Sequence, residues 1–438
     1  MTEVQTMKNK NASISPLLNE AGAKPGLFNR DGTKTVLSSL ISIAIGMAIG
    51  SIIVSVVALF SDSIDARSAW EGIRLVFFGV LSTGRDAAGE LTFGFNPTNF
   101  GDMLFRATPI ILTGLSVAVA YKTGLFNIGA SGQYLMGTAA TLAIALSIPS
   151  SSVSPVIIWI LAFLGGIAAG AVWGAVPGLL KALLNINEVI ACIMTNWIAA
   201  NLVTWFFDAN KQFQNASEAG KAAYVCKTTS NGVATSKMLL DKVFPGSQVN
   251  GCIIIAIIIA VIMYIVMNKT TLGYQLKACG GNRHAAKYAG INDKRNIILS
   301  MAIAGGLAGS AAALYWLSGN TEFYWSTYQA LPAEGFNGIP VAFLAANNPI
   351  GIIFTGILMS MLNIAGLQIK NLTTYNEYLT DIIIAVIVYL SAFAMLIKSF
   401  IGKRGKKSKK ADDDITVETS IFEEDVTVEN KNEGEATL

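Results

Sequence analysis

The sequence predicts an all-α polytopic membrane protein with about ten transmembrane helices, and three observations predict it. Charged residues make up only 13% of the 438 residues, whereas soluble proteins carry about a quarter. Apolar runs long enough to cross a bilayer recur along the chain. Lysine and arginine gather at both ends and in one connecting segment, the pattern that orients membrane helices. This composition excludes a soluble enzyme, a nucleic-acid-binding protein and a disordered chain.

The charge deficit divides the chain into three parts. Residues 1–34 and 398–438 hold 26 of the 59 charged residues, and the 363 residues between them are about 9% charged. We therefore predict a polar cytoplasmic N-terminus over residues 1–34 and a transmembrane domain over residues 35–400. Residues 401–438 are basic and then acidic, and we expect a disordered cytoplasmic tail that is solvated or contacts a partner.

Nine apolar runs are long enough to cross the hydrocarbon, which takes about 20 residues. They cover residues 35–60, 103–121, 130–149, 155–180, 188–207, 251–268, 296–318, 349–368 and 378–398. The first run is too long for the apolar part of a signal peptide and lacks a cleavage site, so we expect it to remain as a membrane helix.

Both ends of the chain are predicted to lie in the cytoplasm, because five basic residues precede the first run and seven occupy residues 398–410. Two cytoplasmic ends require an even number of crossings, so a tenth span is needed. Residues 335–346 (GFNGIPVAFLAA) are the candidate, although they are short and contain Gly338 and Pro340. Irregular backbone at membrane depth is tolerated only inside protein or beside a cavity, so we expect this segment near a pathway.

The longer connecting segments mostly agree with this topology. Residues 61–102 hold six acidic residues against three arginines and are expected outside, whereas residues 269–295 hold six basic residues and are expected inside. Residues 208–249 carry five lysines and three acidic residues, yet the count places them outside; loops of this length follow the charge rule weakly. Cys226 and Cys252 lie in or beside this segment, where a disulfide could form, and their pairing is left open.

The sequence contains no recognisable catalytic, nucleotide or metal site. It lacks a P-loop and the C-x-x-C and H-x-x-x-H spacings, so we expect no enzyme activity and no cofactor on this chain. Arg106, Glu188 and Asp381 fall near the ends of their predicted spans, where snorkelling to the interface explains them. No acidic residue falls in the middle of a span, which disfavours proton or sodium coupling. An ion-coupled secondary carrier or a channel for a neutral polar solute remains the alternative.

The segment 269–295 is longer than a plain connector between two membrane helices needs to be. Asn282 can cap a short helix from about Arg283 to Ala289, and Gly290 can end it. Exposed alanines beside basic residues then suggest a surface on which a partner docks. An ordinary basic connecting segment is the alternative.

Five motifs follow one another along the chain in an order that resembles a known family. They are residues 107–115 (ATPIILTGL), 124–133 (GLFNIGASGQ), 187–190 (NEVI), 194–197 (MTNW) and 335–342 (GFNGIPVA). Over roughly residues 100–395 the chain resembles permease subunits of ABC importers, in the branch of branched-chain amino acid, ribose and nucleoside permeases. Nucleoside and simple-sugar permeases are the most similar. Ser131 departs from the pattern, because an acidic residue is common there, and residues 345–347 replace a more basic stretch.

The resemblance implies a type II, cobalamin-importer-like fold in the plasma membrane, with two permease subunits around one pathway for nucleosides or related simple sugars. The second subunit would often be non-identical, and an extracellular substrate-binding lipoprotein would deliver the solute. The segment 269–295 would dock its coupling helix on a separate ATP-binding subunit, which would hold ATP and Mg²⁺. The implied contact residues are Gly281, Arg283, His284, Ala285, Ala286, Tyr288 and Gly290. The choice of solute and of homodimer or heterodimer is left open.

Polar side chains within the predicted spans are candidates for lining the substrate pathway. They are Asn127, Gln133, Asn196 and Asn337. Each is also explained as a helix-packing hydrogen bond, so this alternative stays open. The glycines at 165–166, 170, 305–306 and 309 are expected at close helix contacts rather than in the pathway.

Overall fold

The computed structural model describes residues 31–60, 65–215, 223–325, 329–376 and 378–392. The chain divides into two compact units, residues 1–42 with 393–438, and residues 43–392. Only residues 31–42 of the first unit are described, so residues 1–30 and the predicted tail 401–438 lie outside the described part. Residues 31–34, predicted as the end of the polar N-terminus, form the start of a helix. The fold below is that of the second unit.

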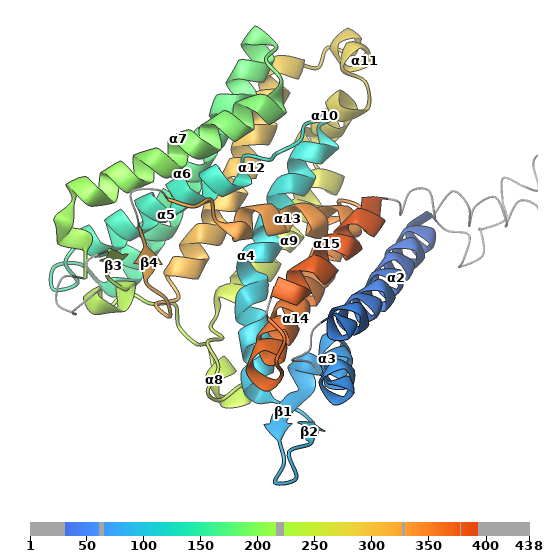
Figure 1. Ribbon diagram of the computed structural model, residues 1–438. Helices are drawn as coiled ribbons and strands as arrows, with labels where there is room; N and C mark the ends of the chain where they lie inside the picture. Colours follow the sequence, from blue (N-terminus) through green and yellow to red (C-terminus); the bar gives the residue numbers. More distant parts are fainter. Residues whose placement is uncertain (1–30, 61–64, 216–222, 326–328, 377, 393–438) are drawn as a thin grey trace, which may run out of the picture. The chain divides into compact units, whose positions relative to one another are not determined.

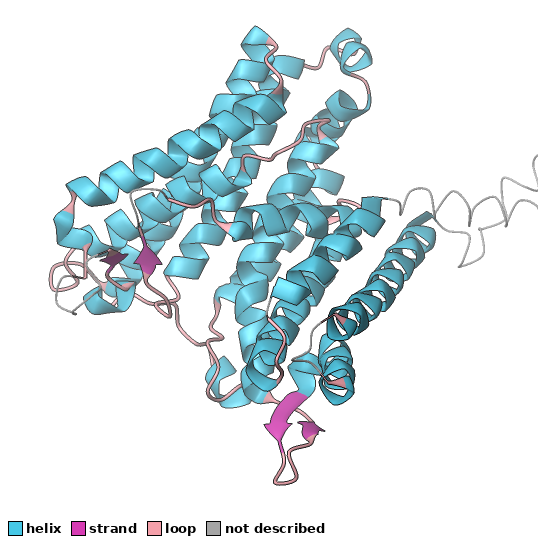
Figure 2. Ribbon diagram, in the orientation of Figure 1, coloured by secondary structure: helices cyan, strands magenta, loops and turns pink. Residues whose placement is uncertain are grey.

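The described chain is mainly helical, with two small two-stranded sheets (Figures 1 and 2). The helices are α2 Asp31–Leu59, α3 Ala66–Phe78, α4 Pro97–Lys122, α5 Ala130–Ser147, α6 Pro155–Leu184, α7 Glu188–Ala209, α8 Leu240–Val243, α9 Cys252–Lys269, α10 Thr271–Gly281, α11 Arg283–Tyr288, α12 Asp293–Trp316, α13 Ala333–Leu344, α14 Pro349–Leu372 and α15 Tyr378–Ala392. The strands are β1 Ser82–Arg85, β2 Leu91–Phe93, β3 Tyr224–Val225 and β4 Phe323–Tyr324, and short 3₁₀ turns cover Gly79–Leu81, Lys211–Phe213 and Thr228–Asn231.

Four of the long helices begin with an asparagine cap. Asn96, Asn187, Asn292 and Asn348 precede α4, α7, α12 and α14, and each side chain accepts a hydrogen bond from a main-chain N–H of the first turn. These N–H groups have no partner within the helix, so an Asn side chain stabilises the helix start. Proline at the first position of α4 and α14 adds a backbone already set for a helix.

Every predicted span contains a helix, but the count of ten crossings is not confirmed. Six helices in the described part are long and apolar enough to cross a membrane, namely α4, α6, α7, α9, α12 and α14. The predicted tenth span is α13, whose 12 residues extend only about 18 Å. The hydrocarbon layer is about 30 Å thick, so α13 does not cross it alone.

Close helix contacts surround α4 and join α6 to α12. Nearly all side chains of α4 beyond residue 106 are buried, against α9, α12, α13 and α14. α6 and α12 approach through Gly170, Gly305 and Gly309, where a Cβ would collide with backbone of the facing helix. This confirms the predicted close-packing role of these glycines.

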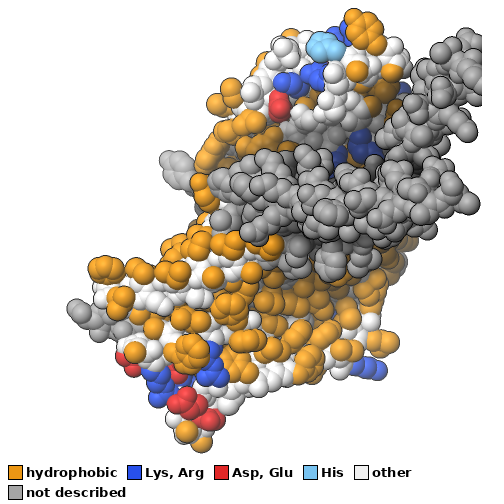
Figure 3. Space-filling model, turned by 90° about the vertical axis from the view of Figure 1, so that its right-hand side faces the viewer, with side chains coloured by type: hydrophobic (Ala, Val, Ile, Leu, Met, Phe, Trp, Pro, Cys, Tyr) orange, Lys and Arg blue, Asp and Glu red, His pale blue; other side chains and the backbone are white. Residues whose placement is uncertain are grey.

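The two ends of α4 contact different connecting segments. At its start, Thr98 donates a hydrogen bond to the Pro245 carbonyl (3.2 Å), and Asp102 accepts one from the Gln248 N–H (2.8 Å). At its end, Gly124 packs on Gly280 of α10. Residues 245–248 of the lysine-containing segment 208–249 therefore lie at the opposite end of α4 from α10 and α11 (Figure 1). On the face drawn in Figure 3, charged side chains gather at two ends with a broad apolar band between them.

Several elements were predicted as loops. α3 and the β1–β2 hairpin occupy part of residues 61–102, and β3 pairs with β4 across a long sequence separation. Their segments are short, so they lack the long hydrophobic periodicity that reveals a helix. The question of a Cys226–Cys252 disulfide is also answered: the Cys252 thiol lies in hydrogen-bonding distance of Thr235 Oγ1 (3.3 Å) and the Leu314 carbonyl (3.2 Å) and is not bonded to Cys226.

Candidate functional site

The predicted short helix after Asn282 is present as α11. The Asn282 side chain accepts a hydrogen bond from the Ala285 N–H at 3.0 Å, and Gly290 follows the helix with a φ of +79°. Five of the seven predicted docking residues lie on α11, Gly281 is the last residue of α10, and Gly290 lies in the turn after α11. Those exposed to solvent are Gly281, His284, Ala285, Tyr288 and Gly290. Ala286 is buried, so it anchors the helix instead of forming its outer surface.

α10 attaches α11 to the helices of the core. Leu276 and Cys279 of α10 are buried, and Asn296 of α12 donates a hydrogen bond to the Cys279 sulfur at 3.7 Å. Gly280 packs against the end of α4. Arg283 of α11 pairs with Asp293 at the start of α12 (3.1 Å). α11 is therefore connected to α4 through α10 and to α12 through both α10 and the Arg283–Asp293 ion pair.

Three of the four predicted pathway residues form a buried polar cluster. Asn127 and Gln133 donate amide hydrogen bonds to each other (2.8 and 3.0 Å), and Asn127 also donates to Ser116 (3.0 Å). Asn196 accepts from the Gly132 N–H and donates to the Ile128 carbonyl. All three predicted residues are at most 2% exposed. They connect the start of α5 to α4 and α7, and they are not among the residues that line the two cavities described next.

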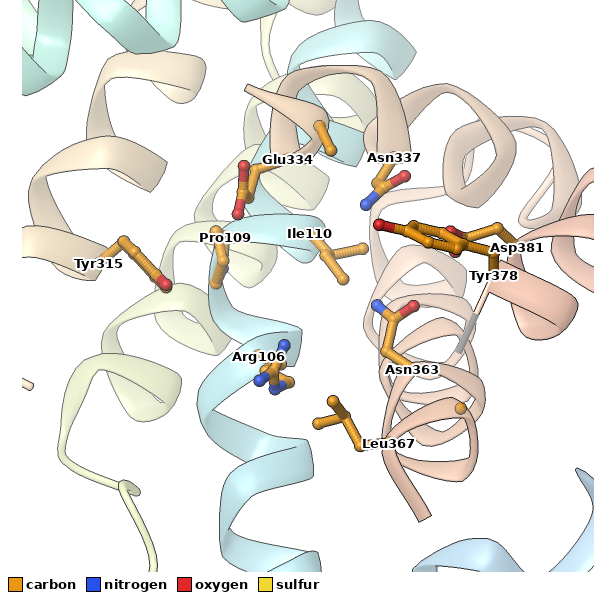
Figure 4. Close-up of a pocket in the computed structure, with 12 residues that line it drawn as sticks. Arg106, Pro109, Ile110, Tyr315, Glu334, Asn337, Asn363, Leu367, Tyr378 and Asp381 are labelled. Atoms are coloured by element: carbon orange, nitrogen blue, oxygen red, sulfur yellow. The ribbon is translucent and has the colours of Figure 1, made fainter. Parts of the chain in front are cut away.

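The fourth residue, Asn337, lines a cavity of about 260 Å³ among α4, α12, α13, α14 and α15 (Figure 4). Its polar side chains are Arg106, Tyr315, Glu334, Asn337, Asn363, Tyr378 and Asp381. Pockets that enclose drug-sized ligands span about 300–1,000 Å³. The cavity therefore suits a small polar molecule.

A second cavity of about 300 Å³ continues from the first. Both are lined by Ile110, Asn337, Asn363 and Asp381, and the second adds apolar side chains such as Met359. α13 contributes to both cavities, so the short segment predicted to lie beside a pathway does line a continuous hollow.

The charged lining corrects one prediction. Arg106 and Asp381 were expected to snorkel from helix ends, but both line the first cavity. The Asn96 cap and Pro97 start α4 six residues before the predicted run, which moves Arg106 into the third helical turn. Glu188, by contrast, lies at the first position of α7 and pairs with Lys181 at 2.9 Å.

Tyr315 lines the first cavity together with Arg106 and Glu334. Its ring stacks on Phe105 with centroids 5.4 Å apart. Figure 4 shows Glu334 and Arg106 both to the right of its phenol. Tyr134, on α5, is 2% exposed, and its hydroxyl has no hydrogen-bond partner in the described part of the chain.

Sequence reasoning missed most of this lining. Asn363 interrupts the apolar α14, which is a signal that could have identified it. Glu334 precedes the apolar run 335–346 by one residue, and Tyr315 and Tyr378 fit equally well as packing or interfacial aromatics. Among the described residues, no three His, Cys, Asp or Glu side chains are placed to hold a metal ion.

A charged cluster binds the β1–β2 hairpin to α3 and α14. The Arg85 guanidinium donates to both oxygens of the nearly buried Glu71 carboxylate and to the Leu372 carbonyl. Arg67 also donates to Glu71 (3.1 Å). The Arg85 hydrogen bond holds the pKa of Glu71 below its ordinary value, against the opposing effect of burial. This cluster therefore fixes the segment at which α14 turns toward α15.

Comparison with known proteins gives several consistent matches. Residues 99–392 match the family described as branched-chain amino acid transport system / permease component. The guanosine ABC transporter permease protein NupP of Bacillus subtilis is 33% identical over 85% of this chain and 97% of its own length. The nucleoside ABC transporter permease protein NupB of Lactococcus lactis is 34% identical over 85% of this chain and 94% of its own length. The glucose ABC transporter permease protein TsgB13 of Haloferax volcanii is 28% identical over 74% of this chain and 83% of its own length. No solved structure gives a significant match.

Proposed function

The chain belongs to the permease family of branched-chain amino acid transport systems, and we propose that it is the membrane-spanning permease subunit of an ABC importer for nucleosides. Two relatives that share 33–34% identity with it are named as guanosine and nucleoside permeases. The polar cavity among the helices gives such a solute a place within the subunit.

One observation carries this proposal furthest: the α10–α11 corner rests on two of the five helices that line the cavity, α4 and α12. α10 packs on the end of α4 and hydrogen-bonds to α12. α4 contributes Arg106 and Ile110 to the cavity, and α12 contributes Tyr315. A partner that moves the exposed face of α11 therefore changes the cavity through two rigid helices.

The partner on α11 is an ATP-binding subunit. Nothing resembling a P-loop occurs in this sequence, so ATP and Mg²⁺ are held by that subunit and not by this chain. Tyr288, which is 95% exposed, and Tyr274, which is 70% exposed, give it an aromatic surface. Aromatic side chains that are exposed before binding contribute strongly to protein interfaces.

The topology follows from placing α11 in the cytoplasm. Both termini are then cytoplasmic, and α13 serves as a short tenth membrane element that is sheltered inside the protein, as a type II permease fold requires. The α3–hairpin segment and residues 223–250 face the outside, where a substrate-binding lipoprotein delivers the solute. A second permease subunit, which we expect to be non-identical, completes the pathway.

An ion-coupled secondary carrier is the second candidate. The carboxylates of Glu334 and Asp381 at the cavity favour it, because acidic groups at membrane depth can carry a proton or a cation. The attachment of α10 and α11 to the cavity helices favours the ABC importer.

Uptake of labelled guanosine tests the function. Cells that lack their own nucleoside transport are given the importer with and without this chain. We expect uptake only with the chain present, and equal uptake in both strains would refute the proposal. Labelled uridine and ribose, measured in the same cells, then define the range of solutes.

A double substitution tests the docking role of α11. Ala285→Glu places a charge on the exposed face, and Gly290→Pro cannot adopt the observed φ of +79°. The double variant should reach the membrane but lose uptake. Normal uptake would contradict docking at α11.

A further inference from the structure

Arg106 and Glu334 require opposite hydrogen-bonding groups from a solute in the cavity. The guanidinium only donates hydrogen bonds, and an ionised carboxylate only accepts them. Both side chains line the cavity, and no ion pair within 4 Å joins them in the described part of the chain. Arg106 is exposed and Glu334 is half-buried, so both charged groups are accessible to a solute that enters the cavity. The cavity therefore favours a solute that presents acceptors at one end and donors at the other.

One further side chain supports a built site in this cavity. Tyr315 lines it together with Glu334 and Arg106, and its ring is positioned by its stack on Phe105 (Figure 4).

The opposite wall offers amides and an aromatic ring. Asn337 and Asn363 come from α13 and α14, and Figure 4 shows the Tyr378 ring extending from α15 toward Asn337. Amide side chains pair with the polar edges of nucleobases, and aromatic rings stack on their faces. A monosaccharide has hydroxyl groups but no such planar heterocycle.

We propose that Arg106 and Glu334 orient a neutral ribonucleoside in this cavity, with acceptor atoms of the base on Arg106 and the ribose hydroxyls on Glu334. This inference rests on the proposed function, since it concerns how the same cavity recognises its solute. A vicinal diol presents two O–H donors to one carboxylate, as acidic side chains bind ribose hydroxyls in nucleotide-binding proteins. Glu334 thus makes the permease itself selective for ribose over sugars that lack these hydroxyls.

The test compares guanosine with 2′,3′-dideoxyguanosine in the complete importer. The substrate-binding lipoprotein is the same in every strain, so a change in the uptake ratio between strains reports on this chain. Glu334→Gln weakens charge-assisted hydrogen bonds to neutral ones, and guanosine uptake should fall roughly tenfold. Dideoxyguanosine uptake should change by less than about twofold, because that solute lacks the hydroxyls.

Two further variants sharpen the comparison. Arg106→Gln should lower uptake of both solutes to the same extent, because the base is common to them. Glu188→Gln removes a carboxylate that pairs with Lys181 away from the cavity and should leave the ratio unchanged. Immunoblots of membranes check the level of each variant. If the Glu334→Gln protein is absent from the membranes, Glu334→Asp is used in its place.

The outcomes separate the two proposals. A guanosine-specific loss in the Glu334 variant supports recognition by this residue. Equal losses for both solutes, or no loss, overturn it while nucleoside import stands. If the unaltered importer takes up neither solute above the level of cells lacking this chain, the proposed function itself fails.

Discussion

Gly280 of α10 lies so close to Lys122 at the end of α4 that a Cβ at position 280 would collide with the Lys122 carbonyl oxygen. The same Cβ would stand 2.9 Å from the Gly124 nitrogen. These neighbours are backbone atoms, which cannot rotate away. The contact therefore fixes the distance between the α10–α11 corner and a helix that lines the cavity.

Gly280→Ala should separate α10 from α4 and impair the transmission of motion between them. Overpacking of this kind costs about 1–3 kcal/mol, and we expect a lower thermal unfolding temperature together with reduced uptake. Gly281→Ala is the matched control for stability, because a Cβ there has no neighbour within 4 Å. Equal unfolding temperatures for the two variants would contradict the contact.

Gly309→Ala and Gly306→Ala form a second matched pair on α12. A Cβ on Gly309 would collide with the Gly166 carbonyl of α6, whereas the nearest atom to a Cβ on Gly306 is 3.5 Å away. We expect destabilisation of about 1–3 kcal/mol for the first and little change for the second. Chemical denaturation in detergent measures both, and a larger loss for Gly306→Ala would refute the packing of α6 on α12.

Glu71 should make the stability of the segment formed by α3 and the β1–β2 hairpin depend on pH. Its pKa is lowered in the folded protein by Arg85, so its contribution is fully present above the unfolded pKa of about 4.3 and is lost as pH falls through the folded value. Unfolding temperatures measured between about pH 3 and 6 should fall on acidification. Glu71→Gln should show a shallower dependence, and an unchanged slope would contradict the role of this carboxylate.

Replacing Asn127 should lower the stability of the protein, whereas replacing Asn337 should lower uptake. Asn127→Ala removes both partners of the buried Gln133 amide and should cost about 1–3 kcal/mol of stability. Asn337→Ala removes a cavity side chain and should lower uptake with little change in unfolding temperature. Measuring both quantities for both variants distinguishes structural from pathway residues, and the reverse pattern would contradict the assignment.

The helices were predictable because apolar runs and Asn caps are local features. The α11 helix is an example, since Asn282 and Gly290 mark both of its ends within nine residues. The number of membrane crossings was harder to predict from the sequence, because α13 is shorter than a membrane span and its role depends on packing against α4.

The cavity could be predicted only in part. Asn337 was identified from a short polar interruption, but Asn127 has the same character and forms a packing cluster instead. The difference depends on which neighbours each side chain meets, and those come from distant parts of the chain. Arg106 was misjudged because hydropathy marks where a run becomes apolar, whereas the helix begins at the Asn96 cap.

The energy source of transport tests the central claim most directly. Guanosine uptake is measured in proteoliposomes that hold this chain with its second permease and ATP-binding subunits, supplied with the binding lipoprotein. The account predicts that uptake requires ATP and stops when the ATP-binding subunit is catalytically inactive, with or without an ion gradient. Uptake driven by a proton or sodium gradient in the absence of ATP would contradict it.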